Sequence, residues 1–238
     1  MAELPRYGRA LLKISGEALA GNRDFGFDPD LISKIAGEIA EAQKTGTELG
    51  IVIGGGNIFR GATAAPLGIQ PVVGDHIGMV ATVLNALVLR SALEAKGVSA
   101  HAMSAFAVGC FIELFERERA LDYLRNGHVV IFAGGTGNPC FTTDSAAALR
   151  AVELDMQLLI KATQVRGVFD KDPRKHPDAV FFEAISPGEV LRRGLQVMDA
   201  ASIEILGRKK IPTIVLDLHV PGNIVRALAG ERVGTVIA

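Results

Sequence analysis

Short apolar segments alternate with longer amphipathic segments along most of the chain. Runs rich in β-branched residues are typical of buried strands, whereas apolar residues three or four positions apart are typical of helices packed on one side. The pattern predicts strands over residues 9–15, 50–53, 98–103, 129–132, 158–162, 213–216 and 235–237. It predicts helices from the N-cap Asp28 to Gly46 and over residues 117–125, 144–154, 200–207 and 223–229.

Residues 72–96 form a long segment that is apolar on more than one face. A helix of this kind is either central to the core or buried by a second subunit. The segment therefore predicts a subunit interface.

Continuous apolar strands separated by helices indicate a parallel sheet that is covered on both faces. We therefore expect an α/β protein, a three-layer α/β/α sandwich with a mainly parallel central sheet. The 238 residues suffice for one large domain, or for two small lobes around a common sheet. In such sheets ligands bind beyond the carboxyl ends of the strands.

The formal net charge of −1 gives no electrostatic reason to expect nucleic acid or a membrane surface as a partner. The two cysteines form no CxxC pattern, which favours a reduced, cytoplasmic setting. The chain opens with no signal-peptide pattern, and no apolar run is expected to cross a bilayer. The five histidines lack metal-ligand spacing, so we expect no zinc-type metal site.

Three glycine-rich turns each follow a predicted strand: Ser15-Gly16, Gly54 to Gly56 and Gly134 to Gly137. Such turns let backbone N–H groups approach an anion closely, and all three should lie at one edge of the sheet. The alternative is that they are ordinary turns of an α/β fold with no phosphate nearby. The Walker A pattern and the GxGxxG fingerprint of dinucleotide-binding proteins are both absent.

Two lysines, Lys13 and Lys161, interrupt apolar strands. A lysine in a central strand is costly unless its ammonium group reaches a partner, and a phosphate would be a suitable one. The alternative for Lys13 is an edge strand from which the side chain reaches water. Arg60 follows the triple glycine and either clamps a phosphoryl group or lies on the surface of a helix.

Five aspartates fall near the expected loop edge or in turns, namely Asp75, Asp144, Asp170, Asp172 and Asp199. Asp144 and Asp199 precede or open predicted helices, so the simpler prediction for both is an N-cap. No Ser-His-Asp or Cys-His arrangement is evident.

Several motifs together closely resemble the bacterial-type UMP kinases of the amino-acid kinase superfamily. They are LLKISGEAL (11–19), VIGGGNIFRG (52–61), VVGDHIGM (72–79), GGTGNPCFTTDSAA (134–147), KAT (161–163), GVFDKDP (167–173) and VMDAAS (197–202). The resemblance covers nearly the whole chain in order. It implies the amino-acid kinase fold as a single domain over residues 1–238, with an acceptor-binding lobe of about 1–155 and a nucleotide-binding lobe of about 156–238.

The resemblance also implies ATP-dependent phosphorylation of UMP to UDP in pyrimidine nucleotide synthesis, with Mg²⁺ as cofactor. The implied catalytic residues are Lys13, Arg60, Asp199 and Asp144. The implied ATP-binding residues are Lys13, Ile14, Ser15, Gly16, Gly56, Arg60, Thr163, Phe169 and Asp172. The implied UMP-binding residues are Gly55, Asp75, Thr136, Gly137, Asn138, Pro139, Cys140, Phe141, Thr142 and Thr143.

Regulation and assembly are implied in the same way. The resemblance implies a homohexamer with GTP as an activator and UTP as an inhibitor, and its allosteric stretch falls on Gly21, Asn22, Arg23, Asp24, Phe25 and Gly26. Arg166 stands where an acidic residue is common in the family, and Glu94 replaces a basic residue tied to effector binding. These departures bear on the response to GTP.

Two other functions fit the same motifs less well. One keeps the fold and phosphorylates an amino-acid carboxylate or carbamate, which requires a carboxylate pocket in place of the TGNPCFTT stretch. The other is a non-catalytic nucleotide-binding or storage protein, since a fold does not determine a function. A pure binder has no need of Lys13, Arg60 and Asp199 together.

Overall fold

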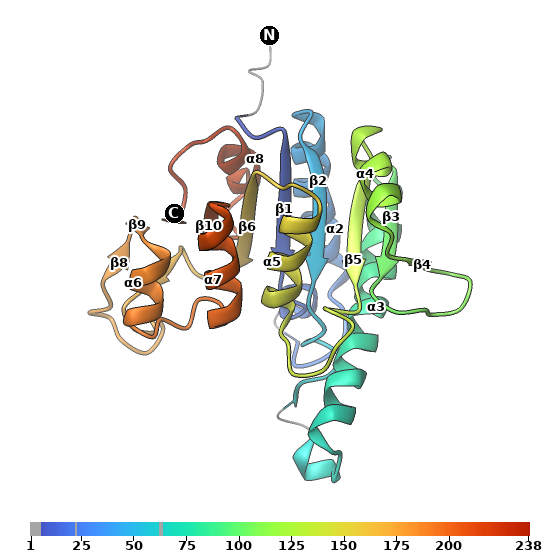
Figure 1. The fold of residues 1–238 in the computed structure, drawn as a ribbon, viewed down its shortest axis with the longest axis horizontal. Coiled ribbons are helices and arrows are strands. Elements are labelled where there is room, and N and C mark those ends of the chain that lie inside the picture. Colours follow the sequence, from blue (N-terminus) through green and yellow to red (C-terminus); the bar gives the residue numbers. More distant parts are fainter. Residues whose placement is uncertain (1–5, 22, 62–63) are drawn as a thin grey trace.

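A central sheet of nine strands organises the computed structural model, which describes residues 6–21, 23–61 and 64–238 (Figure 1). The strand order is β4-β3-β5-β2-β1-β6-β10-β11-β9, and all neighbours are parallel except β10 and β11. The strands are β1 (Arg9–Ile14), β2 (Glu48–Ile53), β3 (Ala100–Ser104), β4 (Glu113–Leu114), β5 (Val129–Ala133), β6 (Leu158–Thr163), β9 (Ala184–Ile185), β10 (Thr213–Asp217) and β11 (Thr235–Ile237). A separate two-stranded ribbon pairs β7 (Val168–Phe169) with β8 (Phe181–Phe182).

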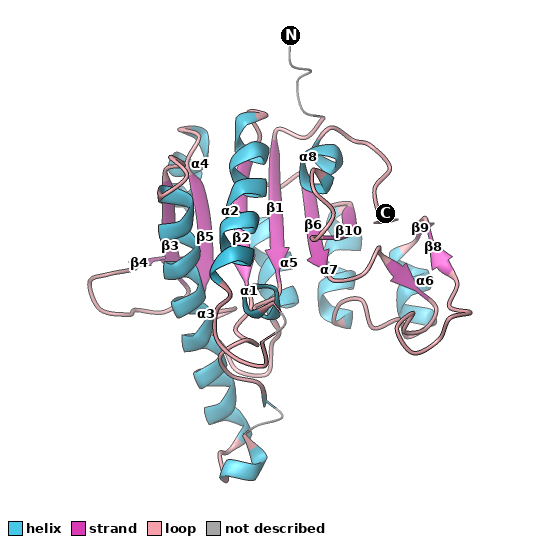
Figure 2. Cartoon of the chain, turned by 180° about the vertical axis from the view of Figure 1, so that it is seen from behind, coloured by secondary structure: helices cyan, strands magenta, loops and turns pink. Residues whose placement is uncertain are grey.

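Helices cover both faces of the sheet. The helices are α1 (Glu17–Ala20), α2 (Pro29–Lys44), α3 (Pro71–Glu94), α4 (Arg117–Arg125), α5 (Thr143–Glu153), α6 (Pro187–Arg192), α7 (Ala200–Lys209) and α8 (Asn223–Leu228), with a 3₁₀ turn at Ala65–Leu67. One apolar core joins the sheet to α2, α3 and α8, and a second core joins its other face to α4, α5 and α7. Figure 2, seen from behind, shows α2, α3 and α8 in front of the strands. The predicted three-layer α/β/α sandwich is confirmed.

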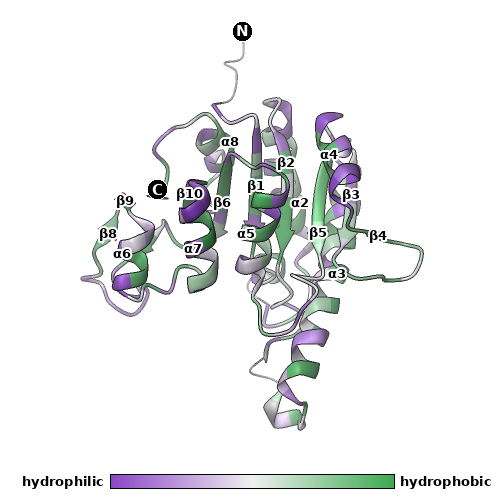
Figure 3. Ribbon diagram, viewed as in Figure 1, coloured by the Kyte–Doolittle hydropathy of each residue, from purple (hydrophilic) through white to green (hydrophobic). Residues whose placement is uncertain are grey.

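The strands are apolar on both faces because each face is covered. In β1, Leu12 and Ile14 point into the α2–α3 core, and Leu11 points into the α4–α5–α7 core. Successive side chains of a strand alternate between faces, so a strand buried on both sides has no polar face. Figure 3 shows this apolar character in the strands of the sheet and polar colour on the outer turns of several helices.

The elements that were not predicted are short. They are β4, β7, β8, β9, α1 and α6, and none is longer than six residues. Such segments contain too few positions to establish a period of 2 or 3.6.

Helix α3 corrects one expectation. We expected no segment able to span a bilayer, yet among the described residues α3 alone is long and apolar enough to do so by length and composition. The helix packs on β2, β3 and β5, and its inner side is buried through residues such as Val83, Leu89 and Leu93. These contacts place α3 in the helical layer that covers one face of the sheet.

Candidate functional site

The three glycine-rich turns lie at one edge of the sheet, as predicted. They follow β1, β2 and β5, which are parallel, so the carboxyl ends of the three strands meet there. The turns after β1 and β2 touch: a Cβ atom on Gly16 would lie 2.7 Å from both the Gly54 O and the Gly56 N atoms. Glycine is therefore required by this close approach, because a Cβ atom would also lie 2.7 Å from the side-chain oxygen of Asn57.

The second glycine of the β2 turn lies against a helix. A Cβ atom on Gly55 would lie 2.8 Å from the carbonyl oxygen of Gly78 and 2.9 Å from the Cβ of Ala81, both in α3. Helix α3 consequently runs directly beside the turn and holds its backbone in place.

Lys13 and Lys161 occupy adjacent positions on neighbouring central strands. Lys13 pairs with Lys161 in the register of β1 and β6. Since β1 lies in the middle of the sheet, the edge-strand alternative for Lys13 is wrong. Both side chains share the face of Leu11 and Leu159, which is the face that α5 covers.

The two ammonium groups converge on one carboxylate. Lys13 Nζ lies 2.9 Å from Asp144 Oδ1, and Lys161 Nζ donates a hydrogen bond of 2.7 Å to Asp144 Oδ2. The side chains are 9%, 14% and 12% exposed for Lys13, Lys161 and Asp144. Lys161 also donates to the carbonyl oxygen of Val197. Two cations and one anion thus meet at the N-terminal turn of α5, where the helix dipole adds further positive potential.

Burial governs the ionisation of Lys161. Desolvation lowers its pKa from the usual 10.5, and the positive charge of Lys13 lowers it further, while Asp144 acts in the opposite direction. The net direction is downward, as expected when one carboxylate serves two buried lysines.

The predicted N-cap role of Asp144 is wrong. The N-cap of α5 is Thr142, whose Oγ1 accepts hydrogen bonds from the backbone N–H groups of Asp144 (3.1 Å) and Ser145 (3.3 Å). Asp144 lies in the first turn of α5 instead, and its side chain points toward the sheet, where it contacts Lys13 and Lys161.

Asp199 is an N-cap, as predicted, and also joins two helices. Its Oδ1 accepts from the backbone N–H (2.8 Å) and the Oγ (2.7 Å) of Ser202 in α7. Its Oδ2 accepts from the Ser145 Oγ (2.9 Å) and from the Thr142 Oγ1, both at the start of α5. Partial burial favours a higher pKa for this carboxyl, but these hydrogen bonds prevail and hold its pKa below the usual value.

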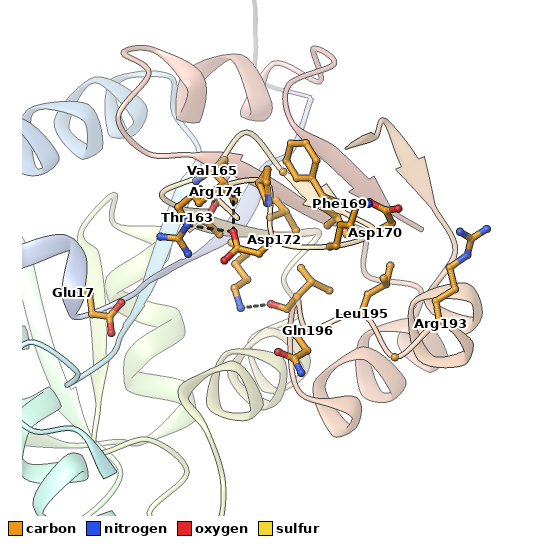
Figure 4. A pocket seen from close by; sticks show the side chains of 18 residues that line it. Glu17, Thr163, Val165, Phe169, Asp170, Asp172, Arg174, Arg193, Leu195 and Gln196 are labelled. Atoms are coloured by element: carbon orange, nitrogen blue, oxygen red, sulfur yellow. Dashed lines mark hydrogen bonds and ion pairs between the residues drawn. The ribbon is translucent and has the colours of Figure 1, made fainter. Parts of the chain in front are cut away.

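Two of the cavities at this edge are lined by predicted ligand-binding residues, and the larger of these two lies on the C-terminal half of the chain (Figure 4). Its volume is about 700 Å³, and its walls include Lys161 and the predicted nucleotide-binding residues Thr163, Phe169 and Asp172. Glu17 reaches it from the opposite side. The backbone N–H of Arg174 donates to Asp172 Oδ1 and lowers the pKa of that carboxyl.

A smaller cavity of about 160 Å³ reaches Thr143, the residue before Asp144. It brings together part of the predicted acceptor set: Gly55, Asp75, Asn138, Phe141 and Thr143. Other members of that set lie outside its walls. Cys140 contributes its backbone N–H, which donates to Asp75 Oδ2 at 2.8 Å, and Thr142 is turned toward Asp199.

The chain is similar to known kinases in sequence and in structure. Residues 8–217 match the model of the amino acid kinase family. Curated uridylate kinases of Mesorhizobium japonicum and Xanthomonas euvesicatoria are 51% and 49% identical to this chain, cover all of it, and are themselves covered to 99% and 98%.

Solved structures agree. A UMP kinase from Bacillus anthracis superimposes with a TM-score of 0.94 at 38% identity, over 97% of this chain and 96% of that one. A UMP kinase from Ureaplasma parvum superimposes with a TM-score of 0.91 at 33% identity, over 98% and 99%. The chain belongs to the amino acid kinase family.

Within this family frame, Arg60 lies beside the glycine turn. Its Nε donates to the carbonyl oxygen of Gly56 at 3.0 Å, and a terminal nitrogen lies 3.4 Å from Glu17 Oε1. Arg60 therefore contacts one wall residue of each cavity, Gly56 of the smaller and Glu17 of the larger. The buried side chain of Ile14 leaves only its backbone to face a ligand.

The residues expected to form an allosteric stretch lie close to the same turn. The backbone N–H of Gly26 donates to the Asn57 carbonyl oxygen at 2.8 Å, and Phe25 is exposed. Asn22 lies outside the described residues.

The sequence marks Lys161 as unusual but does not indicate a catalytic role for it. The signal was present, because Lys161 interrupts an apolar strand in the same way as Lys13. Its partner Asp144 becomes evident only when the position of α5 over β1 and β6 is known.

Proposed function

We propose that this protein transfers the γ-phosphoryl group of ATP to UMP, giving ADP and UDP, in pyrimidine nucleotide synthesis. One observation carries the proposal: two lysines converge on Asp144, and this group adjoins two cavities. Lys161 lines the larger cavity together with Thr163, Phe169 and Asp172, and Thr143, next to Asp144, lines the smaller one together with Gly55 and Asp75. A chain from the uridylate kinase branch needs this arrangement, with donor and acceptor on either side of a cationic centre.

The assigned roles follow from the two cavities. The adenosine of ATP would occupy the larger cavity with Thr163, Phe169 and Asp172. Its phosphates would face Lys13 to Gly16, Gly56 and Arg60, and UMP would lie against Gly55, Asp75 and the run Thr136 to Thr143. Nearly all walls of the larger cavity come from residues 161–215 and all walls of the smaller from 55–143, which supports a nucleotide lobe after about residue 155 and an acceptor lobe before it.

The chemistry needs alignment and charge neutralisation more than proton transfer. The phosphate of UMP is already anionic, so no general base is required. Lys13 and Lys161 place two ammonium groups where negative charge develops, and Asp144 holds both in position. Fixed donors of this kind need no reorganisation during the reaction.

Mg²⁺ is proposed to accompany ATP and to neutralise charge on its phosphates. Mg²⁺ is usually bound by one or two carboxylates together with phosphate oxygens and water. Asp199 already accepts four hydrogen bonds and Asp144 already pairs with two lysines, and the described residues form no three-ligand metal group. This donor set fits an ion held mainly by the nucleotide.

We further propose a cytoplasmic homohexamer that responds to GTP and UTP. The outward side of α3 exposes Val72, Val73, Val80 and Leu84, which supports a subunit contact. The stretch from Gly21 to Gly26 is proposed as the effector segment, and Arg166, whose guanidinium lies over the ring of Phe181, marks the departure from the family pattern.

The test is a coupled assay of ADP release with MgATP and a panel of acceptors offered separately: UMP, CMP, dUMP, acetylglutamate and carbamate. Turnover that is strongest with UMP is expected. Turnover with acetylglutamate or carbamate instead would change the acceptor. Failure with every acceptor, from protein that binds ATP, would support the storage alternative.

A further inference from the structure

Three polar side chains on one side of α3 each form a hydrogen bond with the backbone of a different stretch of the proposed acceptor site. Asp75 Oδ2 accepts from the Cys140 N–H at 2.8 Å, and Thr82 Oγ1 accepts from the Gly134 N–H at 2.7 Å. Asn85 Nδ2 donates to the Gly54 carbonyl oxygen at 2.6 Å. Residues seven and three positions apart lie along one side of a helix. Asp75 belongs to the acceptor site already described, whereas Thr82 and Asn85 have no assigned role.

Thr82 and Asn85 are buried in a helix that is otherwise largely apolar on its inner side. Thr82 is 2% exposed and Asn85 is 0% exposed. A buried polar group is costly unless its hydrogen bonds are made, and an apolar residue would suit simple packing at either position. Both side chains instead make hydrogen bonds to the backbone of a glycine at the start of a turn, Gly134 for Thr82 and Gly54 for Asn85. Both turns are proposed to bind ligands.

The hydroxyl of Thr82 is fully oriented. It donates to the Met79 carbonyl oxygen at 2.7 Å, so a lone pair remains for the Gly134 N–H. Gly134 has a φ of 78° and accepts from the Gly137 N–H at 2.9 Å. Thr82 therefore holds the first residue of the turn that leads to Asn138 and Phe141 in the smaller cavity.

Asn85 acts through a paired amide. Asn85 Nδ2 donates to Asn57 Oδ1 at 2.7 Å, and Asn57 Nδ2 donates back to Asn85 Oδ1 at 3.1 Å. Asn57 is also buried and donates to the Gly26 carbonyl oxygen at 3.0 Å. The pair thus fixes both ends of the turn from Gly54 to Asn57, which supplies Gly55 and Gly56 to the walls of the smaller cavity.

We infer that Thr82 and Asn85 are positioning residues of the phosphoryl-transfer site, an inference that rests on the proposed function. Thr82 sets the acceptor turn that begins at Gly134, and Asn85 sets the glycine turn against which the transferring group lies. Displacing such a turn by about 1 Å can lower the rate on the order of 100-fold, because the reacting atoms lose alignment.

The experiment compares Thr82→Val, Thr82→Ser and the control Thr47→Val. Valine keeps the branched shape but removes the hydroxyl, whereas serine retains it. Thr47 is also buried and its Oγ1 donates to the Tyr7 carbonyl oxygen at 3.0 Å, at the start of β2 and far from the glycine turns. For each protein we would measure kcat, KM for UMP, KM for ATP and the melting temperature.

We expect Thr82→Val to raise KM for UMP about tenfold or more, to leave KM for ATP within about twofold, and to be rescued by Thr82→Ser. Thr47→Val should lower the melting temperature and leave both KM values unchanged. Equal effects of the two valine variants on stability, with no change in the ratio of the KM values, would overturn the inference. A wild-type enzyme inactive toward UMP would instead reject the proposed function.

Asn85→Ala provides an independent arm if Thr82→Val does not fold. It should lower kcat about tenfold or more while KM for ATP changes little, since the glycine turn aligns the reacting groups. An unchanged kcat in a folded Asn85→Ala protein would remove Asn85 from the inference.

Discussion

At the scale of single residues, the centre of the site is a group of three charges. Lys13, Lys161 and Asp144 together carry one net positive charge and are nearly buried. Removing one member of a buried ion pair typically costs about 3–5 kcal/mol, because the remaining charge lacks a partner. Here two lysines share one carboxylate, so one positive charge is not neutralised within the group. It lies at the edge of the sheet where the anionic substrates are proposed to bind and would neutralise part of their charge.

The lowered pKa of Lys161 predicts an alkaline limit to activity. Between the folded pKa and the usual 10.5, the unfolded chain binds more protons at this group, so stability rises with pH while the positive charge proposed to face the phosphates is lost. We expect kcat/KM for ATP to fall at a pH below 10.5. Lys161→Arg should move this fall to higher pH, because a guanidinium stays protonated above pH 12.

The measurement is a pH–rate profile of both proteins between pH 7 and pH 10.5. Lys44→Arg, an exposed lysine paired with Glu41, is the matched control and should reproduce the wild-type profile. An alkaline limb that stays in place in Lys161→Arg would assign the limit to another group.

At the scale of elements, the start of α5 is fixed by contacts from three directions. Thr142 caps the helix, Asp144 meets the lysines of β1 and β6, and Ser145 and Thr142 donate to Asp199 at the start of α7. The position of Asp144 over the sheet therefore depends on the contact between the ends of α5 and α7.

The substitution Asp199→Asn distinguishes the capping of α7 by Asp199 from the contact of Asp199 with the start of α5. An asparagine oxygen can still accept from Ser202, but its amide group does not accept from Thr142 and Ser145. We expect a loss of roughly 1–2 kcal/mol in the free energy of unfolding at pH 7. Denaturant titrations of Asp199→Asn and Asp199→Ala would show the alanine variant to be less stable if the cap contributes separately.

The pH dependence gives a second readout. The pKa of Asp199 is lowered in the folded protein, so its stabilising effect is full above the ordinary value of 3.8 and is lost as the pH falls through the folded pKa. The difference between wild type and Asp199→Asn should therefore shrink as the pH falls below the ordinary value of 3.8. A difference that is constant with pH would show that the carboxylate charge plays no part.

The long elements and the meeting of the glycine turns at one edge of the sheet were predictable from sequence, while the partners of individual side chains were not. The strands and helices with clear periods were found, and the lysines in β1 and β6 drew attention because they break apolar runs. Asp144 was misassigned because Thr142 and Asp144 are both good caps, and the choice is made by lysines distant in sequence. Thr82 and Asn85 drew no attention, since polar residues in an apolar helix acquire meaning only from the turns beside them.

At the scale of the whole molecule, α3 joins the proposed acceptor site to the surface. Its inner side carries Thr82 and Asn85, while Val80 and Leu84 on its outer side are 48% and 46% exposed. Residues two positions apart, such as Val80 and Thr82, point to nearly opposite sides of a helix. A subunit packed on the outer side would therefore rest on the same rigid helix that holds the acceptor turns.

The proposed assembly predicts that a charge on this outer side separates the subunits. Val80→Glu and Leu84→Glu place a carboxylate in an apolar contact, where burying an unpaired charge is unfavourable. We expect light scattering to show a smaller mass for each variant than for the wild type. Val220→Glu is the matched control, because Val220 is an equally exposed apolar residue, 45% exposed, in the loop between β10 and α8. A reduced mass in both α3 variants, with the control unchanged, would place the subunit contact on α3. Wild-type mass in the α3 variants would mean that other surfaces hold the assembly together, and a monomeric wild type would reject the proposed hexamer itself.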